Sequence, residues 1–171
     1  HAGGSANNSH IGFEICEDAW RGDARPGYRL KNRKVDLIFN PSASHFAMGK
    51  THERKELIER SSSIFDCFYC YVNLLGNEAG RMIFDGEILV TKDGKTLARN
   101  QLLSFQDYQV LSFDLENTTP EVAAILSKEW EFVQASALGL FDYLRKSKSK
   151  GFVLSLSGGA DSSTIAILVA E

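Results

Sequence analysis

The sequence predicts an α/β protein in two parts, a layered α/β domain over residues 1–116 and the opening of a second α/β unit over residues 117–171. Three observations predict this class. Short apolar runs of strand length alternate with charged, helix-patterned segments. A polar segment that contains a proline interrupts the pattern at residues 116–120. Near the end, an apolar run leads into a glycine-rich loop and a helix start, which is half of a doubly wound unit.

Composition narrows the possible functions. The chain has 171 residues, 43% of them hydrophobic and 24% charged, the balance of an ordinary globular protein. A net charge of −3 argues against nucleic-acid and anionic-membrane partners. No apolar run approaches the roughly 20 residues of a membrane span, and no secretory signal opens the chain. Three cysteines are too few for a disulfide scaffold, so the expected compartment is the cytoplasm. The small, polar opening, residues 1–10, is expected to be an exposed or cut end.

The elements of the first part follow from periodicity and turn chemistry. Alternating apolar residues indicate a strand that ends at Cys16, and Asn40-Pro41-Ser42 is expected to end the next strand. The dipeptide Asp93-Gly94 marks a hairpin turn. In chain order, the pattern predicts a strand at 11–16, a strand at 35–39, a helix at 51–65, a strand at 69–75, a hairpin over 83–99 and a strand at 108–115.

The second part begins with helix-start chemistry. Thr119 can cap a helix with Pro120 in its first turn, so one long amphipathic helix is predicted over residues 121–147. Positive charge over residues 146–150 and a following glycine favour its end there. A buried strand at 152–156, a tight loop and a helix from Thr164 complete the chain.

The loop at residues 157–163, SGGADSS, carries the clearest binding chemistry. Glycines let backbone N–H groups approach an anion, and the following helix N-terminus favours phosphate, although an inert turn is the alternative reading. The loop is not a Walker loop, because no Gly-Lys-Ser/Thr follows. It resembles the pyrophosphate loop of N-type ATP pyrophosphatases, which adenylate a carboxyl or carbonyl oxygen and let ammonia displace AMP. The resemblance implies ATP binding, with Mg²⁺ on Asp161, by Ser157, Gly158, Gly159, Asp161, Ser162 and Ser163.

The three cysteines have different settings. Cys67 and Cys70 form a C-x-x-C inside an apolar run with no second ligand pair, so buried structural thiols are expected. Cys16 stands at a predicted strand tip, where a thiol can be held rigidly and still be reached by a substrate. A small buried hydrophobe is the alternative reading for Cys16.

The string GFEICEDAW around Cys16 resembles the nucleophile segment of the nitrilase-type glutaminase domain of glutamine-dependent NAD synthetases. The similarity continues through NPSASHFAMGK and YVNLLGNEAGRMIFDGEI, and FVLSLSGGADSS resembles the start of the synthetase domain. The resemblance implies the end of a nitrilase-like αββα domain over residues 1–116. It implies the start of a Rossmann-like ATP pyrophosphatase domain over residues 117–171.

The resemblance also implies a reaction. Cys16 attacks the side-chain amide of glutamine, and Ser44 and Lys50 contact the glutamine. The alternative readings are a turn hydroxyl for Ser44 and a solvated lysine at a helix start for Lys50. The released ammonia then converts deamido-NAD, adenylated by ATP, into NAD, and the full enzyme is a homo-oligomer. The family's general-base Glu and its Lys precede the cysteine, but only 15 residues precede Cys16 here, with no Lys and with Glu14 as the only acid. The chain therefore matches a middle segment and is expected to be inactive alone.

Three further readings concern the same residues. Glu14 and Cys16 would share a face if the strand reached Cys16, which would make Glu14 the first substitute base. Glu17 and Asp18 are read as helix-start or structural carboxylates. A stand-alone carbon–nitrogen hydrolase and a non-catalytic module remain as alternatives; the SGGADSS loop argues against the first of these, and the missing triad residues favour the second for the chain taken alone.

Overall fold

The structure, a computed structural model, describes residues 9–116 and 119–170, and it confirms the α/β class. The strands are β1 (Ile11–Phe13), β2 (Leu37–Ser42), β3 (Phe68–Asn73), β4 (Leu75–Glu78), β5 (Met82–Asp85), β6 (Ile88–Lys92), β7 (Lys95–Arg99) and β8 (Glu121–Val122). The helices are the short 3₁₀ turns η1 (Cys16–Trp20) and η2 (Gly22–Ala24), and α1 (Gly27–Asn32), α2 (Lys50–Phe65), α3 (Lys128–Ser147) and α4 (Ala160–Ala170).

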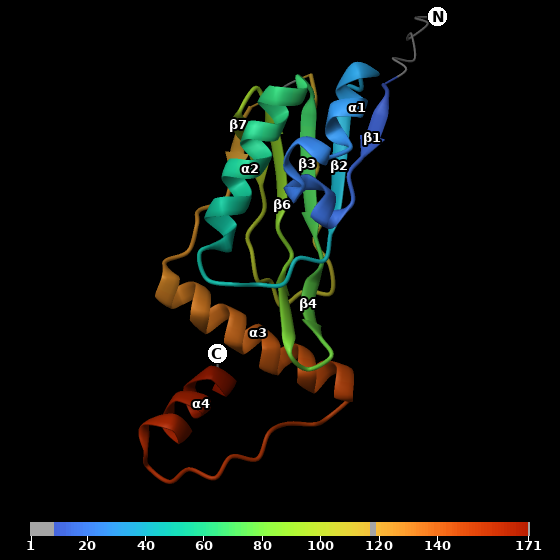
Figure 1. The fold of residues 1–171 in the computed structure, drawn as a ribbon. Coiled ribbons are helices and arrows are strands. Elements are labelled where there is room, and N and C mark those ends of the chain that lie inside the picture. Colours follow the sequence, from blue (N-terminus) through green and yellow to red (C-terminus); the bar gives the residue numbers. More distant parts are fainter. Residues whose placement is uncertain (1–8, 117–118, 171) are drawn as a thin grey trace, which may run out of the picture.

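The main sheet has the strand order β1-β2-β3-β6-β7-β8. Strands β1, β2 and β3 are parallel, β6 and β7 join antiparallel, and β8 is parallel to β7. Helices α1 and α2 lie on one face of this sheet (Figure 1). The hairpin β4–β5 extends from its end toward α3, and α4 packs against α3. One sheet with helices on one face is half of the predicted layered arrangement.

The largest apolar cluster lies between α2 and the sheet. Its buried members are Ile38, Ile58, Phe65, Cys67, Tyr69, Tyr71 and Leu89. The start of α1 approaches this cluster so closely that a Cβ on Gly27 would lie 2.3 Å from the Phe65 ring. Glycine is therefore required at position 27 by packing, and this contact holds α1 against α2.

The end of the second strand differs from the prediction. The sequence Asn40-Pro41-Ser42 was expected to break the strand, but β2 continues to Ser42. Strand β1 pairs with β2 only as far as Phe39, whereas β3 pairs with it through Ser42. Pro41 thus lies where β2 is an edge strand, and an edge tolerates a residue without an N–H.

The predicted hairpin turn is confirmed, with more strands around it than expected. Asp93 and Gly94 both have positive φ, 52° and 75°, as a tight two-residue turn between β6 and β7 requires. Ile83 instead belongs to β5, which pairs with β4 in a separate hairpin. Periodicity alone did not separate β5 from β6, because only two residues divide them.

The predicted strand at residues 108–115 is wrong. This segment forms no strand, but Leu111 and Phe113 pack against a small cluster on the sheet face opposite α2. The buried members of that cluster are Cys70, Val90 and Ala98. The alternating apolar residues of this segment cover part of the sheet face. An extended segment that packs on a sheet shows the same alternation of apolar residues as a strand that pairs within it, so the sequence pattern did not distinguish the two.

The start of the long helix is also corrected. Thr119 and Pro120 precede the short strand β8, and α3 begins only at Lys128. Ser127 caps α3 by accepting a hydrogen bond from Trp130 N at 3.3 Å. The predicted helix end at Ser147 is confirmed. The predicted domain boundary at residue 117 lies outside the described residues, as does most of the segment 1–10.

The predicted strand at residues 152–156 does not form, and α4 begins at Ala160 rather than Thr164. A strand needs a neighbour for its N–H and C=O groups, and within residues 9–116 and 119–170 no strand pairs with this segment. Its apolar side chains are therefore exposed, Val153 completely.

Among the residues that the structure describes, no helix combines the length and the apolar character needed to cross a bilayer.

Candidate functional site

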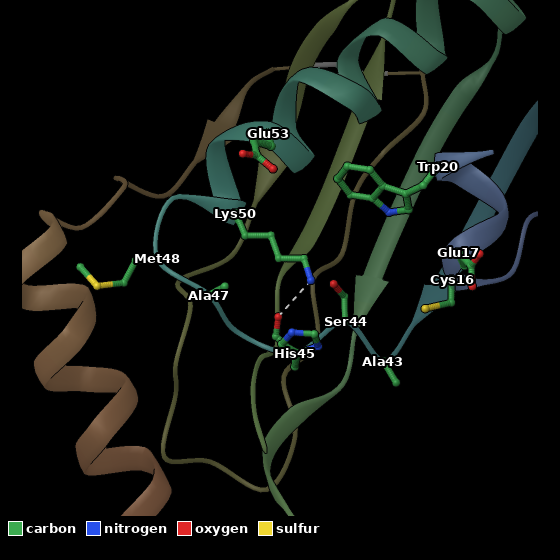
Figure 2. A pocket seen from close by; sticks show the side chains of 10 residues that line it. All are labelled: Cys16, Glu17, Trp20, Ala43, Ser44, His45, Ala47, Met48, Lys50 and Glu53. Atoms are coloured by element: carbon green, nitrogen blue, oxygen red, sulfur yellow. Dashed lines mark hydrogen bonds between the residues drawn. The ribbon is translucent and has the colours of Figure 1, made fainter. Parts of the chain in front are cut away.

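A cavity of about 450 Å³ lies between η1, the loop after β2 and the start of α2. Figure 2 shows that its walls come from these three elements, with Cys16 on one side and the Lys50 side chain entering from the other. The lining residues are Cys16, Glu17, Trp20, Ala43, Ser44, His45, Ala47, Met48, Lys50 and Glu53. The structure thus brings together the three residues predicted to handle glutamine, Cys16, Ser44 and Lys50.

Cys16 is held in an unusual backbone conformation. Strand β1 ends at Phe13, so Cys16 does not lie in the strand as predicted but begins η1 with φ of 47°. A positive φ is costly for a residue with a Cβ and needs support from its surroundings. Part of that support is Asn40, whose Nδ2 donates to the carbonyls of Glu14 and Cys16 at 2.8 and 3.4 Å. The result is a half-buried thiol on a fixed turn beside the cavity.

Glu14 is a structural carboxylate. It is fully buried, and its oxygens accept hydrogen bonds from Arg25, from Tyr69 OH at 2.6 Å and from Gly27 N at 2.6 Å. The ion pair with Arg25 is 2.6 Å long. Burial and the adjacent Glu14 charge raise the pKa of Tyr69, so its hydroxyl stays protonated as a donor. Strand β1 ends at Phe13, so the shared strand face expected for Glu14 and Cys16 does not form, and the Glu14 oxygens are occupied by Arg25, Tyr69 and Gly27 N.

The two acids after Cys16 have different places. Asp18 accepts a hydrogen bond from Ile15 N at 2.9 Å, which closes the first turn of η1 and confirms a structural role. Glu17 also stands in that first turn, as predicted, but its exposed side chain lines the cavity and lies 3.8 Å from Arg21. Sequence reasoning missed this second property, because the turn that aims Glu17 forms only when the strand stops at Phe13.

The opposite wall is built by the loop after β2 and by the first turn of α2. Lys50 is the first residue of α2, and its Nζ donates to the His45 carbonyl at 3.3 Å (Figure 2). The Ser44 backbone is fixed by the side chain of Asn73. Other cavity residues that the sequence analysis did not single out are Trp20, His45, Met48 and Glu53. Helical spacing could have indicated Glu53, which is three residues after Lys50.

The remaining cysteines are buried and free, as predicted. Burial raises the pKa of the Cys67 thiol to about 11 and that of Cys70 to about 12. No group of three or more His, Cys, Asp or Glu side chains that could hold a metal ion occurs in the part of the chain that the structure describes. Cys67 and Cys70 are themselves buried members of the two apolar clusters that pack on the sheet.

We expect these pKa values to separate the cysteines in a labelling experiment. With a pKa of about 11, roughly one Cys67 in a thousand is thiolate at pH 8, and burial also blocks access. Iodoacetamide at pH 8 should therefore modify Cys16 in the native protein and all three cysteines after denaturation, as read by peptide mass spectrometry. Fast native labelling of Cys67 or Cys70 would contradict the buried assignment.

The glycine-rich loop forms a separate, exposed site at the N-terminus of α4. Gly158 has φ of 83°, and apart from its own and its neighbours' atoms nothing lies within 4 Å of the point where a Cβ would stand. The Ser162 hydroxyl lies 3.2 Å from Ser157 Oγ and from the Gly159 carbonyl, which closes the loop. Asp161 is exposed in the first turn of α4. The loop and α4 lie beyond α3, on its side away from the sheet (Figure 1).

Comparisons with known proteins find similarity to NAD synthetases over nearly the whole chain. A model of the NAD synthase family matches residues 132–171. A glutamine-dependent NAD(+) synthetase of Synechocystis is 34% identical over 96% of this chain, which spans 32% of that relative. A mouse glutamine-dependent NAD(+) synthetase is 28% identical over 93% of this chain, and the chain spans 28% of that relative's length. The chain therefore covers about a third of the length of the curated relatives it matches.

Solved structures give the same result. The glutamine-dependent NAD(+) synthetase of Cytophaga hutchinsonii is 50% identical, with a TM-score of 0.80 over 98% of this chain and 26% of its own. The enzyme of Acinetobacter baumannii, solved with ADP, is 26% identical, with a TM-score of 0.83 over 94% of this chain and 31% of its own. By sequence and by fold, the chain is similar to glutamine-dependent NAD(+) synthetases, of whose length it spans about a third.

Proposed function

We propose that the protein that contains this chain makes NAD from deamido-NAD, with ammonia taken from glutamine. The observation that carries the proposal is the cavity that joins Cys16, Ser44 and Lys50 in a chain that also holds the SGGADSS loop. Either feature alone is compatible with another enzyme class. Their combination matches the relatives over nearly the whole chain.

The glutaminase half of the reaction is assigned to the cavity. Cys16 Sγ attacks the carbonyl carbon of the glutamine side chain, ammonia leaves, and water hydrolyses the thioester to glutamate. Lys50 has a positive charge at the cavity wall and is suited to the substrate's α-carboxylate, while Ser44 offers a hydroxyl. The acid that takes the thiol proton is not assigned to Glu14, because Arg25, Tyr69 and a backbone N–H occupy its oxygens.

The synthetase half is assigned to the loop. The open space around Gly158, the hydroxyls of Ser157, Ser162 and Ser163, and the N-terminus of α4 suit the phosphates of ATP. The exposed Asp161 carboxylate suits a hard cation, and Mg²⁺ would neutralise charge on the pyrophosphate. Asp161 is the one acidic residue of the loop, and no group of three possible metal ligands occurs among the described residues. Phosphate oxygens or residues elsewhere in the protein must therefore complete the coordination of the ion.

Two further properties belong to the proposal. Three free cysteines suit a reducing compartment such as the cytoplasm. The resemblance to the family supports a homo-oligomeric full-length enzyme.

An isotope experiment on the full-length protein tests the function. Glutamine labelled with ¹⁵N in its side-chain amide is supplied with deamido-NAD, ATP and Mg²⁺, and NAD is analysed by mass spectrometry. We expect ¹⁵N in the NAD carboxamide and dilution of the label by added ¹⁴NH₄⁺. If glutamate forms without any labelled NAD, a stand-alone hydrolase is the better assignment.

The 171-residue chain by itself should have neither activity. The general base and the lysine that the resemblance places upstream of the cysteine are not in this sequence, and the buried Glu14 cannot replace them. The purified chain should release no glutamate above the level of a Cys16→Ala chain and should form no NAD. Glutamate release that depends on Cys16 would show that a cavity acid, with Glu17 and Glu53 the first candidates, can act as the base.

A further inference from the structure

The side chain of Asn73, the last residue of β3, holds the backbone of a cavity residue from behind. Its Oδ1 accepts from Ser44 N, and its Nδ2 donates to the Ser44 carbonyl, both at 2.9 Å. One carboxamide thus pairs both backbone groups of Ser44, as a neighbouring strand would. Asn73 is 7% exposed and does not line the cavity, so it is no substrate contact.

A second layer of buried charge fixes how this carboxamide is turned. Asn73 Nδ2 also donates to Asp85 Oδ1 at 2.7 Å, and Glu87 N donates to the same oxygen at 3.1 Å. The other oxygen, Asp85 Oδ2, is paired with Arg54 Nη2 at 2.5 Å. A carboxylate only accepts hydrogen bonds, so the amide nitrogen of Asn73 must face Asp85 and its oxygen must face Ser44 N.

The charges behind Asp85 are themselves anchored. Arg54 also pairs with Glu87, and Glu87 accepts from Arg99 Nε at 2.8 Å. All four charged side chains are at most 3% exposed. Arg54 is one turn after Lys50 in α2, so the network joins the helix that carries Lys50 to the loop that carries Ser44. Removing one partner of such a buried pair is costly, which makes the arrangement rigid.

We propose that Asn73 is a positioning residue for glutamine binding, which acts by fixing the Ser44 backbone in the cavity wall while Asp85 fixes its carboxamide. The inference rests on the proposed function only in naming glutamine as the occupant. Its physical basis is preorganisation: a wall held before the substrate arrives costs less to order during binding. The expected signature is weaker glutamine binding with little change in the chemical step.

The test compares Asn73→Ala and Asn73→Ser in the full-length protein. Both remove the two bonds to Ser44, whereas the serine hydroxyl retains a polar group near Asp85. We expect KM for glutamine hydrolysis to rise about tenfold in both variants, which corresponds to about 1.4 kcal/mol. We expect kcat within about threefold of the parent and ammonium-driven NAD formation unchanged. Unchanged ammonium-driven formation shows that the synthetase site of each variant is intact, and a kcat near the parental value shows that the region around the cavity is folded.

Asn100→Ala is the matched control. Asn100 likewise accepts from a backbone N–H, that of Ile88 at 2.7 Å, and donates to a backbone carbonyl, that of Gly86 at 2.9 Å, but neither residue lines the cavity. It should lower the melting temperature without raising KM. A parental KM in Asn73→Ser, or equal KM changes in Asn73→Ala and Asn100→Ala, would overturn the inference.

A calorimetric measurement separates this inference from the proposed function. Glutamine is titrated into the full-length Cys16→Ala protein and into the double variant that combines Cys16→Ala with Asn73→Ser. We expect Kd to be about tenfold higher in the double variant. If the two variants show this difference in Kd but the unsubstituted protein forms no labelled NAD, the proposed function alone is contradicted. Equal Kd values would contradict the positioning role alone.

Discussion

Cys16→Ala should abolish glutamine-driven NAD formation in the full-length protein, with a loss on the order of 10⁴-fold or more. Cys16 carries the only thiol on the cavity wall, among residues 9–116 and 119–170, and no hydroxyl can form the same thioester. Ammonium-driven formation should persist, because the SGGADSS loop is a separate site beyond α3. Both rates are measured by NAD production with either nitrogen source at saturating ATP.

Cys70→Ala is the control for this substitution. Cys70 is buried on the sheet face opposite α2 and does not line the cavity, so its loss is expected to affect packing alone. Glutamine-driven formation should stay near the parental rate at temperatures well below unfolding. If Cys16→Ala retains glutamine-supported turnover, the assignment of the nucleophile is wrong.

Asp161→Asn should impair both glutamine-driven and ammonium-driven NAD formation by roughly 100-fold or more. No lysine stands in the loop, so the charge of bound pyrophosphate must be balanced by the helix N-terminus and by a cation held partly by Asp161. Glutamine hydrolysis at Cys16 should retain measurable activity, because Asp161 does not line the cavity and α4, which carries it, lies beyond α3 on the side away from the sheet. The measurement is ammonium-driven synthesis across a Mg²⁺ titration, in which the variant should need more Mg²⁺.

Glu129→Gln is the matched control for Asp161→Asn. Glu129 is also an acid in the first turn of a helix, α3, but it is not in the loop. Its neutral variant should follow the parental Mg²⁺ curve. Gly158→Val should share the defect of Asp161→Asn, since φ of 83° strains a β-branched residue and its side chain would enter the open space that we propose for a phosphate. An Asp161→Asn protein that matches the parent at every Mg²⁺ level would leave the loop as a structural turn.

Local sequence determined the elements that rest on local chemistry. Helix α2 follows from its charged and apolar pattern, and the β6–β7 turn follows from Asp93-Gly94, because only positive φ at both positions gives the right twist. The end of α3 at Ser147 follows from the positive charges after it. The motif strings around Cys16 and over residues 157–163 carry the resemblance to glutamine-dependent NAD synthetases, because the pairing of both strings in one chain is more specific than either string.

Tertiary structure decided whatever depends on a partner far along the chain. Pro41 remains in a strand because β1 has already ended beside it, and residues 152–156 form no strand because no described strand pairs with them. Cys16 leaves the strand and turns to positive φ because Asn40, from β2, holds its carbonyl. Glu14, which an alternating pattern would place beside Cys16, is instead held by Arg25 and Tyr69. Each of these outcomes depends on hydrogen bonds between residues at least 11 positions apart, and a local pattern has no information about such bonds.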